Sequence, residues 1–383
     1  MLSSVTRGVV MLCVAAVVLA GCSSVGSSDS AGSRTVTTPA YGNPGPFQVG
    51  VTTLDLGSAG ARYGERLATV FYPAELDSAQ LSGRARFSYT QAETLPASLK
   101  ALLPASYNST TIVNAYPDVS GSSKGPFPVV LFSHGLSAQR LFYSSMLAGI
   151  ASWGYVVISP DFLERGLAAL AQGITSTPPP SLDQAIMARA LEMLRRASSQ
   201  PSSVLFGTVD SHRVAALGHS SGGGTALNAL HNPDVATAVG WSPDGLTTPP
   251  SHKPIMFVVA SGDTANTPTQ VRALYDRFPG PKSFVEISGE GHNTYTDICG
   301  PLRHGGGIIG LAEKLKLIDT TSASWALNGC SANDIAPARF WRVVQYYTVF
   351  QLRARLNHGA TSVPVPAKGA FPGFKVTLTQ SAQ

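Results

Sequence analysis

The chain has 383 residues, of which 44% are hydrophobic and 13% are charged, and its formal net charge is +5. A composition this apolar excludes a disordered or fibrous protein and predicts a fold with a hydrophobic core. Because the charge is small and Lys and Arg form no stripe, the sequence lacks the electrostatic pattern of a nucleic-acid-binding protein. The length permits one large α/β domain or two smaller domains.

The N-terminus has the pattern of a bacterial export signal. Arg7 precedes an uncharged apolar run over residues 9–20, which is too short to cross the roughly 30 Å hydrocarbon core of a membrane as a helix. The run ends at residues 19–22 in Leu-Ala-Gly-Cys, which resembles the lipobox of bacterial lipoproteins. The resemblance implies a signal peptide over residues 1–21 and lipid attachment to Cys22. The alternative is an ordinary signal peptide that contains a cysteine.

A polar segment follows the lipobox. Residues 22–46 are rich in Ser, Gly, Thr and Pro, which is typical of a flexible tether that holds a domain away from a surface. We therefore expect an exported protein that is anchored to the bacterial cell membrane through Cys22 and does not span it.

Two cysteines remain beyond Cys13 of the signal peptide and Cys22, namely Cys299 and Cys330. An even number of cysteines in an oxidising compartment predicts a disulfide between them. The alternative is a pair of buried free thiols.

Strand and helix patterns alternate through most of the remaining chain. Strands are expected at residues 47–54, 66–72, 128–133, 155–159, 213–217, 236–240, 254–260 and 283–287, and helices at 141–152, 182–197, 223–230, 267–278, 308–318 and 337–356. Repeated strand–helix units predict an α/β fold with a mostly parallel, doubly wound sheet and helices on both faces. We expect a single domain over residues 47–356 and a C-terminal tail over residues 357–383.

The pattern Gly-x-Ser-x-Gly occurs twice, centred on Ser123 and Ser220. In a nucleophile elbow the serine lies on a sharp turn between a strand and a helix, and the flanking glycines prevent clashes of that turn with its neighbours. Ser220 has an expected strand before it and an expected helix after it, whereas Ser123 lies between polar and Pro-rich segments. We predict that Ser220 is a nucleophile and that Ser123 lies in a loop.

A serine nucleophile needs a base within hydrogen-bond reach and a carboxylate that fixes the tautomer of the base. Asp263 and His292 each follow an expected strand, and loops at the carboxyl ends of parallel strands build the sites of such sheets. The order Ser220, Asp263, His292 is the order of the α/β-hydrolase triad. Asp244, which follows the preceding strand, is the alternative acid.

Other acidic residues and histidines near the site fit these roles less well. Glu290 and Asp297 lie too near His292 in the sequence to orient it in the usual way. No histidine belongs to a metal-ligand spacing such as His-Glu-x-x-His, so we expect neither a metal nor another cofactor.

An oxyanion hole is expected from two backbone amides, one after the nucleophile and one in the loop after the strand at 128–133. These are the amides of Ser221 and Leu136, and Gly135 permits the backbone of the loop to approach the substrate closely.

Four segments, at residues 127–162, 213–223, 258–268 and 289–299, carry a family resemblance. They are similar to segments of bacterial α/β-hydrolases in the dienelactone hydrolase, polyester hydrolase (cutinase-like) and platelet-activating-factor acetylhydrolase group. The resemblance covers about residues 47–350. It implies the α/β-hydrolase fold, a triad of Ser220, Asp263 and His292, and oxyanion donors at Leu136 and Ser221.

Each branch of the group has one feature that bears on this sequence. The platelet-activating-factor acetylhydrolase branch takes its acid from the position of Asp244. Dienelactone hydrolases use a Cys nucleophile, so Ser220 argues against that activity. Polyester hydrolases use a Trp near the position of Trp241 for substrate contact, although a core position for Trp241 is the alternative.

These expectations combine into a serine carboxylic ester hydrolase that acts through an acyl-enzyme on short-chain or polymeric esters at the cell envelope. A short loop between the strands at 236–240 and 254–260 leaves no room for a large lid, which predicts an open site with rims at residues 161–180 and 299–330. The alternatives are an envelope acyltransferase and a catalytically silent binding lipoprotein.

Overall fold

The computed structural model describes residues 40–174, 178–357, 366 and 369–381. The expected signal peptide, the expected lipidation site Cys22 and most of the expected tether lie outside the described residues. Within the described ranges, none of the helices has the length and apolar character that crossing a membrane requires.

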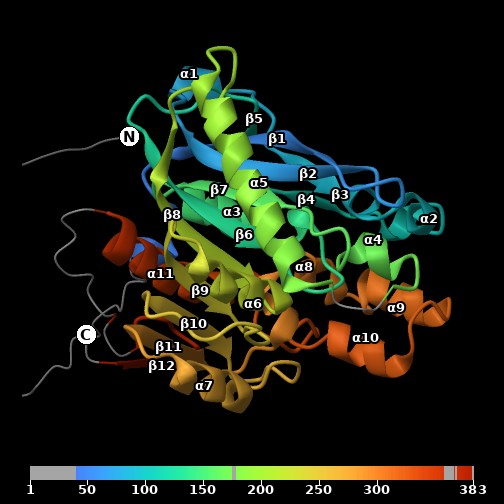
Figure 1. The fold of residues 1–383 in the computed structure, drawn as a ribbon. Coiled ribbons are helices and arrows are strands. Elements are labelled where there is room, and N and C mark those ends of the chain that lie inside the picture. Colours follow the sequence, from blue (N-terminus) through green and yellow to red (C-terminus); the bar gives the residue numbers. More distant parts are fainter. Residues whose placement is uncertain (1–39, 175–177, 358–365, 367–368, 382–383) are drawn as a thin grey trace, which may run out of the picture. The chain divides into compact units, whose positions relative to one another are not determined.

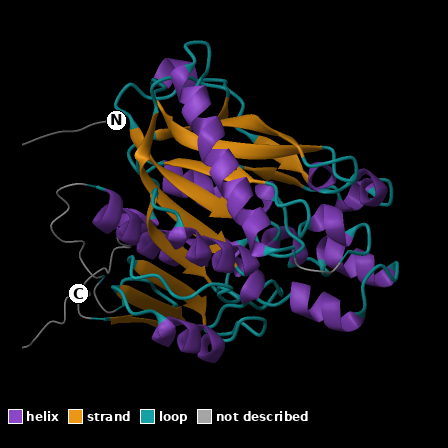
Figure 2. Ribbon diagram, in the orientation of Figure 1, coloured by secondary structure: helices purple, strands orange, loops and turns teal. Residues whose placement is uncertain are grey.

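A ten-stranded sheet forms the centre of the described fold (Figures 1 and 2). In spatial order its strands are β12 (Val376–Gln380), β11 (Lys282–Ile287), β10 (Ile255–Ala260), β9 (Val235–Trp241), β8 (Val209–His219), β6 (Phe127–Ser133), β7 (Val156–Pro160), β2 (Glu65–Ala74), β1 (Gln48–Ser58) and β5 (Tyr116–Pro117). The strands from β11 to β7 pair in parallel. In contrast, β2 pairs antiparallel with β7 and β1, and β12 pairs antiparallel with β11.

Helices cover both faces of this sheet (Figure 2). One face packs against α3 (Ser144–Ala151) and α11 (Pro337–Leu356), and the other against α5 (Pro180–Ser199), α6 (Ser221–Asn228) and α7 (Pro268–Arg277). Because successive side chains of a strand point to opposite faces, Val130 belongs to the first core cluster, and Val129 and Leu131 belong to the second. Burial on both faces explains why β6 is a continuous apolar run in the sequence. The predicted doubly wound sheet is confirmed.

Shorter elements fill the connections. They are η1 (Ala40–Gly42), α1 (Ser78–Leu81), β3 (Ser88–Thr90), η2 (Gln91–Thr94), α2 (Ala97–Lys100), η3 (Ala105–Tyr107), β4 (Thr110–Ile112), η4 (Arg140–Tyr143), α4 (Leu167–Leu170), η5 (Ala229–His231), η6 (His292–Tyr295), α8 (Cys299–Leu302), α9 (Gly307–Lys314) and α10 (Thr320–Ala326). Of these, α8, α9 and α10 follow β11, the last parallel strand, and α9 and α10 contribute residues to the site described below.

The segment expected as a C-terminal tail contributes strand β12, which the sequence analysis does not anticipate. Val376 and Leu378 of β12 pack against the core, and the strand is paired with β11 along its length. The alternation of apolar and polar residues over 376–380 is the period of a half-buried strand. The run is only five residues long, which makes this signal weak in the sequence alone.

Candidate active site

Ser220 lies on a sharp turn between β8 and α6, at the carboxyl end of a central strand. Its backbone has a φ of 55° and a ψ of −126°, a strained conformation for a residue with a side chain. A nucleophile elbow needs such a turn, because it directs the hydroxyl away from both the strand and the helix.

Two glycines make this turn possible. A Cβ on Gly218 would come within 2.0 Å of the carbonyl oxygen of Gly222, and a Cβ on Gly222 would come within 2.0 Å of the carbonyl oxygen of Ser133. Any larger residue at either position would therefore displace the turn. The second Gly-x-Ser-x-Gly pattern has a different setting, because Ser123 lies in an exposed turn where its hydroxyl donates to Glu75 at 2.8 Å.

His292 joins Ser220 to Asp263. The Nε2 atom of His292 lies 2.9 Å from the Oγ of Ser220, and Nδ1 lies 2.8 Å from Oδ2 of Asp263. The other carboxylate oxygen accepts hydrogen bonds from the amides of Ala265 and Asn266 at 2.9 and 2.8 Å. An ionised carboxylate only accepts hydrogen bonds, so Nδ1 carries the imidazole proton and Nε2 is free to accept the serine proton.

The other acidic residues occupy different positions. Asp244 is an exposed residue, and its amide donates to the carbonyl oxygen of Ser220 at 3.2 Å. Glu290 is buried beside Thr294, whose hydroxyl donates to it at 3.3 Å, and burial raises the pKa of Glu290 to about 7. Asp297 accepts from an amide in the first turn of α3 at 3.0 Å, and burial raises its pKa to about 6.

The loop after β6 passes close to Ser220. A Cβ on Gly135 would lie 3.3 Å from the Cβ of Ser220, so only a residue without a side chain fits easily between them. Among the described residues, the structure records no acceptor for the amides of Leu136 and Ser221. The first amides of a helix have no acceptor within it, so the amide of Ser221, the first residue of α6, is available to a ligand.

A buried arginine that the sequence analysis missed joins this loop to the turn at the start of α6. The guanidinium of Arg165 donates to the carbonyl oxygen of His134 and, at 3.2 Å, to the hydroxyl of Ser221. It also donates to Ser133 at 2.7 Å and forms an ion pair with Asp183 at 2.9 Å. One side chain, which is only 2% exposed, thus holds both segments that carry the two free amides.

A second hydrogen-bonded series links the same loop to the backbone of His292. The hydroxyl of Tyr143 accepts from the amide of Gly135 at 3.3 Å and lies 2.8 Å from Nδ1 of His219. Nε2 of His219 lies 2.9 Å from the carbonyl oxygen of His292. A carbonyl only accepts, so Nε2 of His219 carries the proton and Nδ1 accepts from Tyr143. Burial lowers the pKa of His219 well below its ordinary value, which keeps it neutral in this arrangement.

A cavity of about 220 Å³ borders Ser220 and His292. Its wall includes Leu167 and Leu170 of α4 and several residues of α9 and α10, so both predicted rims contribute to it. Trp325 of α10 stacks on His292, with ring centroids 5.7 Å apart and an interplanar angle of 27°.

The predicted disulfide is present at the ends of the second rim. Cys299 and Cys330 are bonded, with their Cα atoms 4.9 Å apart, and both are fully buried. They pack against Leu302 and against partly buried residues of α9, so the disulfide joins the rim to the body of the domain.

Trp241 is a core residue. It is fully buried, its ring stacks on Tyr295, and its Nε1 donates to Thr348 at 3.0 Å. Among the described residues, Trp325 is the tryptophan that lines the cavity, and no motif or spacing in the sequence marks it.

Within the described residues, no cluster of three or more His, Cys, Asp or Glu side chains could hold a metal ion. What these residues do offer is a hydroxyl at Ser220, an imidazole oriented by a carboxylate, and two amide donors.

Comparisons with known proteins relate this chain to several named enzymes. Residues 106–241 match the Chlorophyllase family. The chain is 32% identical over 172 residues to Cutinase 1 from Thermobifida cellulosilytica, covering 43% of this chain and 60% of that protein. It is 28% identical over 213 residues to bis(hydroxyethyl) terephthalate hydrolase from Streptomyces coelicolor, covering 54% of this chain and 61% of that protein. The chain thus spans less than two thirds of the length of these relatives.

A solved structure shares the fold over nearly the whole chain. The ferulic acid esterase from Streptomyces cinnamoneus superposes with a TM-score of 0.60 and 20% sequence identity, covering 87% of this chain and 96% of that chain. At this identity the likeness establishes the fold.

Proposed function

We propose that this chain, an α/β-hydrolase by fold and by similarity to the proteins above, is a serine carboxylic ester hydrolase. The observation that carries the proposal is the hydrogen-bonded series from Asp263 through His292 to Ser220, beside two free backbone amides. Similarity to proteins named as a cutinase and a bis(hydroxyethyl) terephthalate hydrolase supports the same class of reaction.

The first half of the reaction forms an acyl-enzyme. Nε2 of His292 takes the hydroxyl proton of Ser220 as Oγ attacks the ester carbonyl carbon, and Asp263 stabilises the imidazolium that forms. The carbonyl oxygen becomes an oxyanion that accepts hydrogen bonds from the amides of Leu136 and Ser221. His292 then gives its proton to the alcohol oxygen, the carbon–oxygen bond to the alcohol breaks, and the acyl group stays on Ser220.

The second half repeats the same proton transfers with water. Nε2 of His292 takes a proton from a water molecule as that water attacks the acyl carbon, and the proton passes to Oγ of Ser220 as the acid leaves. The substrates that we propose are carboxylic esters met at the cell envelope. The envelope location rests on the Leu-Ala-Gly-Cys sequence that ends at Cys22.

The test compares the two serines that share the Gly-x-Ser-x-Gly pattern. Ser220→Ala should lower kcat on p-nitrophenyl acetate by about 10⁴-fold or more, as loss of a nucleophile does. Ser123→Ala, the matched control in an exposed turn, should keep wild-type activity. Activity that survives Ser220→Ala, or that depends on Ser123, would contradict the proposal. Added alcohols distinguish hydrolysis from acyl transfer, because a transferase would form new esters with them in preference to releasing the free acid.

A further inference from the structure

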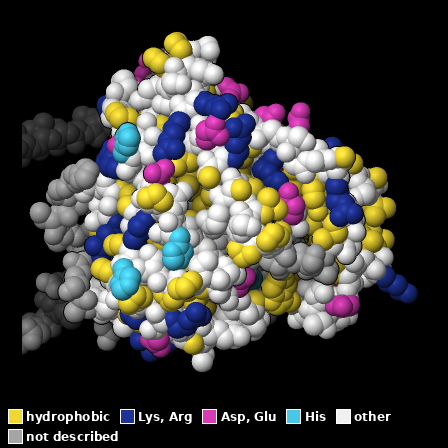
Figure 3. Space-filling view, in the orientation of Figure 1, with side chains coloured by type: hydrophobic (Ala, Val, Ile, Leu, Met, Phe, Trp, Pro, Cys, Tyr) yellow, Lys and Arg dark blue, Asp and Glu magenta, His cyan; other side chains and the backbone are white. Residues whose placement is uncertain are grey.

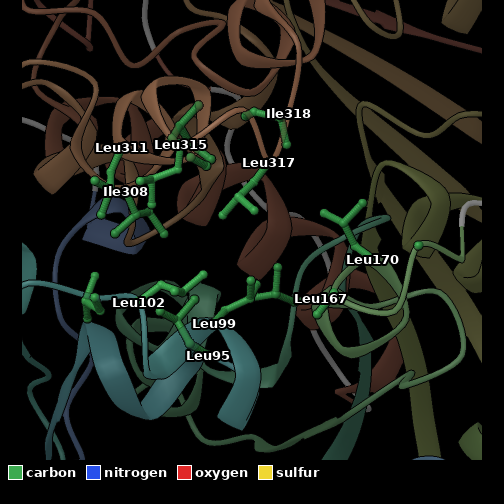
Figure 4. A pocket seen from close by; sticks show the side chains of 15 residues that line it. Leu95, Leu99, Leu102, Leu167, Leu170, Ile308, Leu311, Leu315, Leu317 and Ile318 are labelled. Carbon is green, nitrogen blue, oxygen red and sulfur yellow. The ribbon is translucent and has the colours of Figure 1, made fainter.

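A second cavity, of about 330 Å³, adjoins the one beside Ser220 (Figure 4). We name it the apolar groove. It is formed by residues of three segments that are distant in the sequence, 95–103 around α2, 167–173 around α4, and 308–318 around α9. Figure 4 shows Leu99 and Leu102 on one side of the groove and Ile308, Leu311 and Leu315 on the other. Every side chain that lines it is aliphatic, apart from one glycine without a side chain.

The groove is continuous with the cavity beside the proposed nucleophile. Five residues line both spaces, and they are Leu167, Leu170, Ile308, Ile309 and Ile318. A molecule whose reacting carbon lies at Ser220 can therefore extend into the groove along an uninterrupted aliphatic wall.

The aliphatic side chains of the groove remain exposed in the folded chain. Leu102, Leu315 and Leu317 are 49%, 47% and 49% exposed, and none of the residues of α9 is fully buried. Figure 3 shows apolar side chains gathered over the region where α2 and α9 lie in Figure 1. A contiguous exposed apolar surface of this kind marks a binding site, in contrast to isolated exposed leucines.

The wall formed by α9 is anchored to the rest of the domain. The buried disulfide between Cys299 and Cys330 packs with Leu302 against Ile308 and Ile309. A groove with one anchored wall and a volume of this size has the form of a small-molecule site, which is concave and mostly apolar.

We propose that the apolar groove binds a long hydrocarbon chain of the ester whose carbonyl group reacts at Ser220, an inference that rests on the proposed function. The lining carries no charged or hydrogen-bonding side chain, so a sugar or a charged group would lose its hydration there without compensation. A methylene group loses nothing and gains the free energy of burial. The expectation of an open site for short chains is thereby replaced, because residues of both predicted rims line the groove and extend the apolar wall away from Ser220.

The proposal is tested with a chain-length series of p-nitrophenyl esters, from acetate to decanoate, kept below their aggregation concentrations. Burial of each methylene favours binding by up to about fourfold, so kcat/KM should rise more than tenfold from acetate to decanoate. Leu99→Asp and Leu315→Asp should abolish most of this rise while acetate hydrolysis stays within about twofold of wild type. Phe206→Asp, at a residue that is 55% exposed and lines neither cavity, is the matched control and should behave as wild type.

Two esters identify the part of the substrate that carries the chain. Ethyl decanoate has it on the acyl side and decyl acetate on the alcohol side, and a preference for either that the groove variants remove supports the proposal. A flat chain-length series, or equal effects of Leu315→Asp and Phe206→Asp, overturns it while activity on acetate upholds the proposed function. If no ester is hydrolysed, the binding of decanoic acid to Ser220→Ala is measured by calorimetry. The groove proposal predicts that Ser220→Ala binds decanoic acid and that adding Leu315→Asp to this variant removes the binding. Absence of binding to Ser220→Ala refutes the groove proposal.

Discussion

Replacing Arg165 with Met tests how the two free amides are held in place. Met keeps an apolar stem and removes the guanidinium that bonds to His134, Ser221 and Asp183. The side chain of Asp183 is 10% exposed, and leaving one partner of a buried ion pair alone costs about 3–5 kcal/mol of folding free energy. The amides themselves remain, so we expect a loss in kcat of about 10–100-fold, the size of effect that a displacement near 1 Å produces.

A double variant separates stability from positioning. Arg165→Met with Asp183→Asn removes both charges, so much of the lost unfolding free energy should return. The contacts to His134 and Ser221 stay broken, so kcat should stay low while KM changes little, because the amides stabilise charge that develops in the transition state. Urea unfolding gives the first quantity and steady-state kinetics on p-nitrophenyl acetate the second. A double variant with wild-type kcat would refute the positioning role of Arg165.

Three further predictions follow from the same geometry. Asp263→Asn should lower kcat by about 10⁴-fold and Asp244→Asn by less than about threefold in the same kinetic assay, and the reverse order would assign the acid to Asp244. Replacing Cys299 and Cys330 by Ser should lower the free energy of urea unfolding by about 3–4 kcal/mol, because the bond joins two residues that are 31 positions apart in the sequence. An unchanged free energy of unfolding would show that the bond is dispensable. The raised pKa of Glu290, about 7, means that the folded chain binds a proton which the unfolded chain releases above about pH 4. Its contribution to stability is therefore lost as the pH rises from about 4 to 7, and wild type should lose more unfolding free energy than Glu290→Gln between pH 5 and pH 8, whereas parallel curves would show that Glu290 titrates normally.

The central sheet could be predicted from the sequence because local signals and tertiary burial agree there. Strand β6 is buried on both faces and is a continuous apolar run in the sequence. Helix α11 begins at Pro337, and proline is a common residue in the first turn of a helix. The turn at Ser220 was predictable because the strand, the Gly-x-Ser-x-Gly pattern and the helix are adjacent in the sequence. Gly218 is required by a contact with Gly222 in the same turn, whereas Gly222 is required by a contact with Ser133 on the neighbouring strand.

Other parts of the site depend on contacts that no local pattern reveals. Arg165 reaches Ser221 across 56 residues, and nothing in its neighbourhood distinguishes it from a surface arginine. Trp325 reaches His292 only because the segment between the two cysteines folds back over the cavity. Loop length alone suggested an open site, whereas the groove arises from segments at 95–103, 167–173 and 308–318 that meet only in three dimensions.

The most direct measurement is the mass of the enzyme during turnover. The wild-type chain is mixed with p-nitrophenyl acetate, quenched in acid within the first turnovers, digested and analysed by mass spectrometry. We predict one added acetyl group on the peptide that contains Ser220, with none in Ser220→Ala. His292→Ala should also lack the acetyl group on this timescale, because His292 takes the proton of Ser220 in the acylation step. Turnover of the ester with no acetyl group on Ser220, or with an acetyl group that persists in Ser220→Ala, would contradict the account.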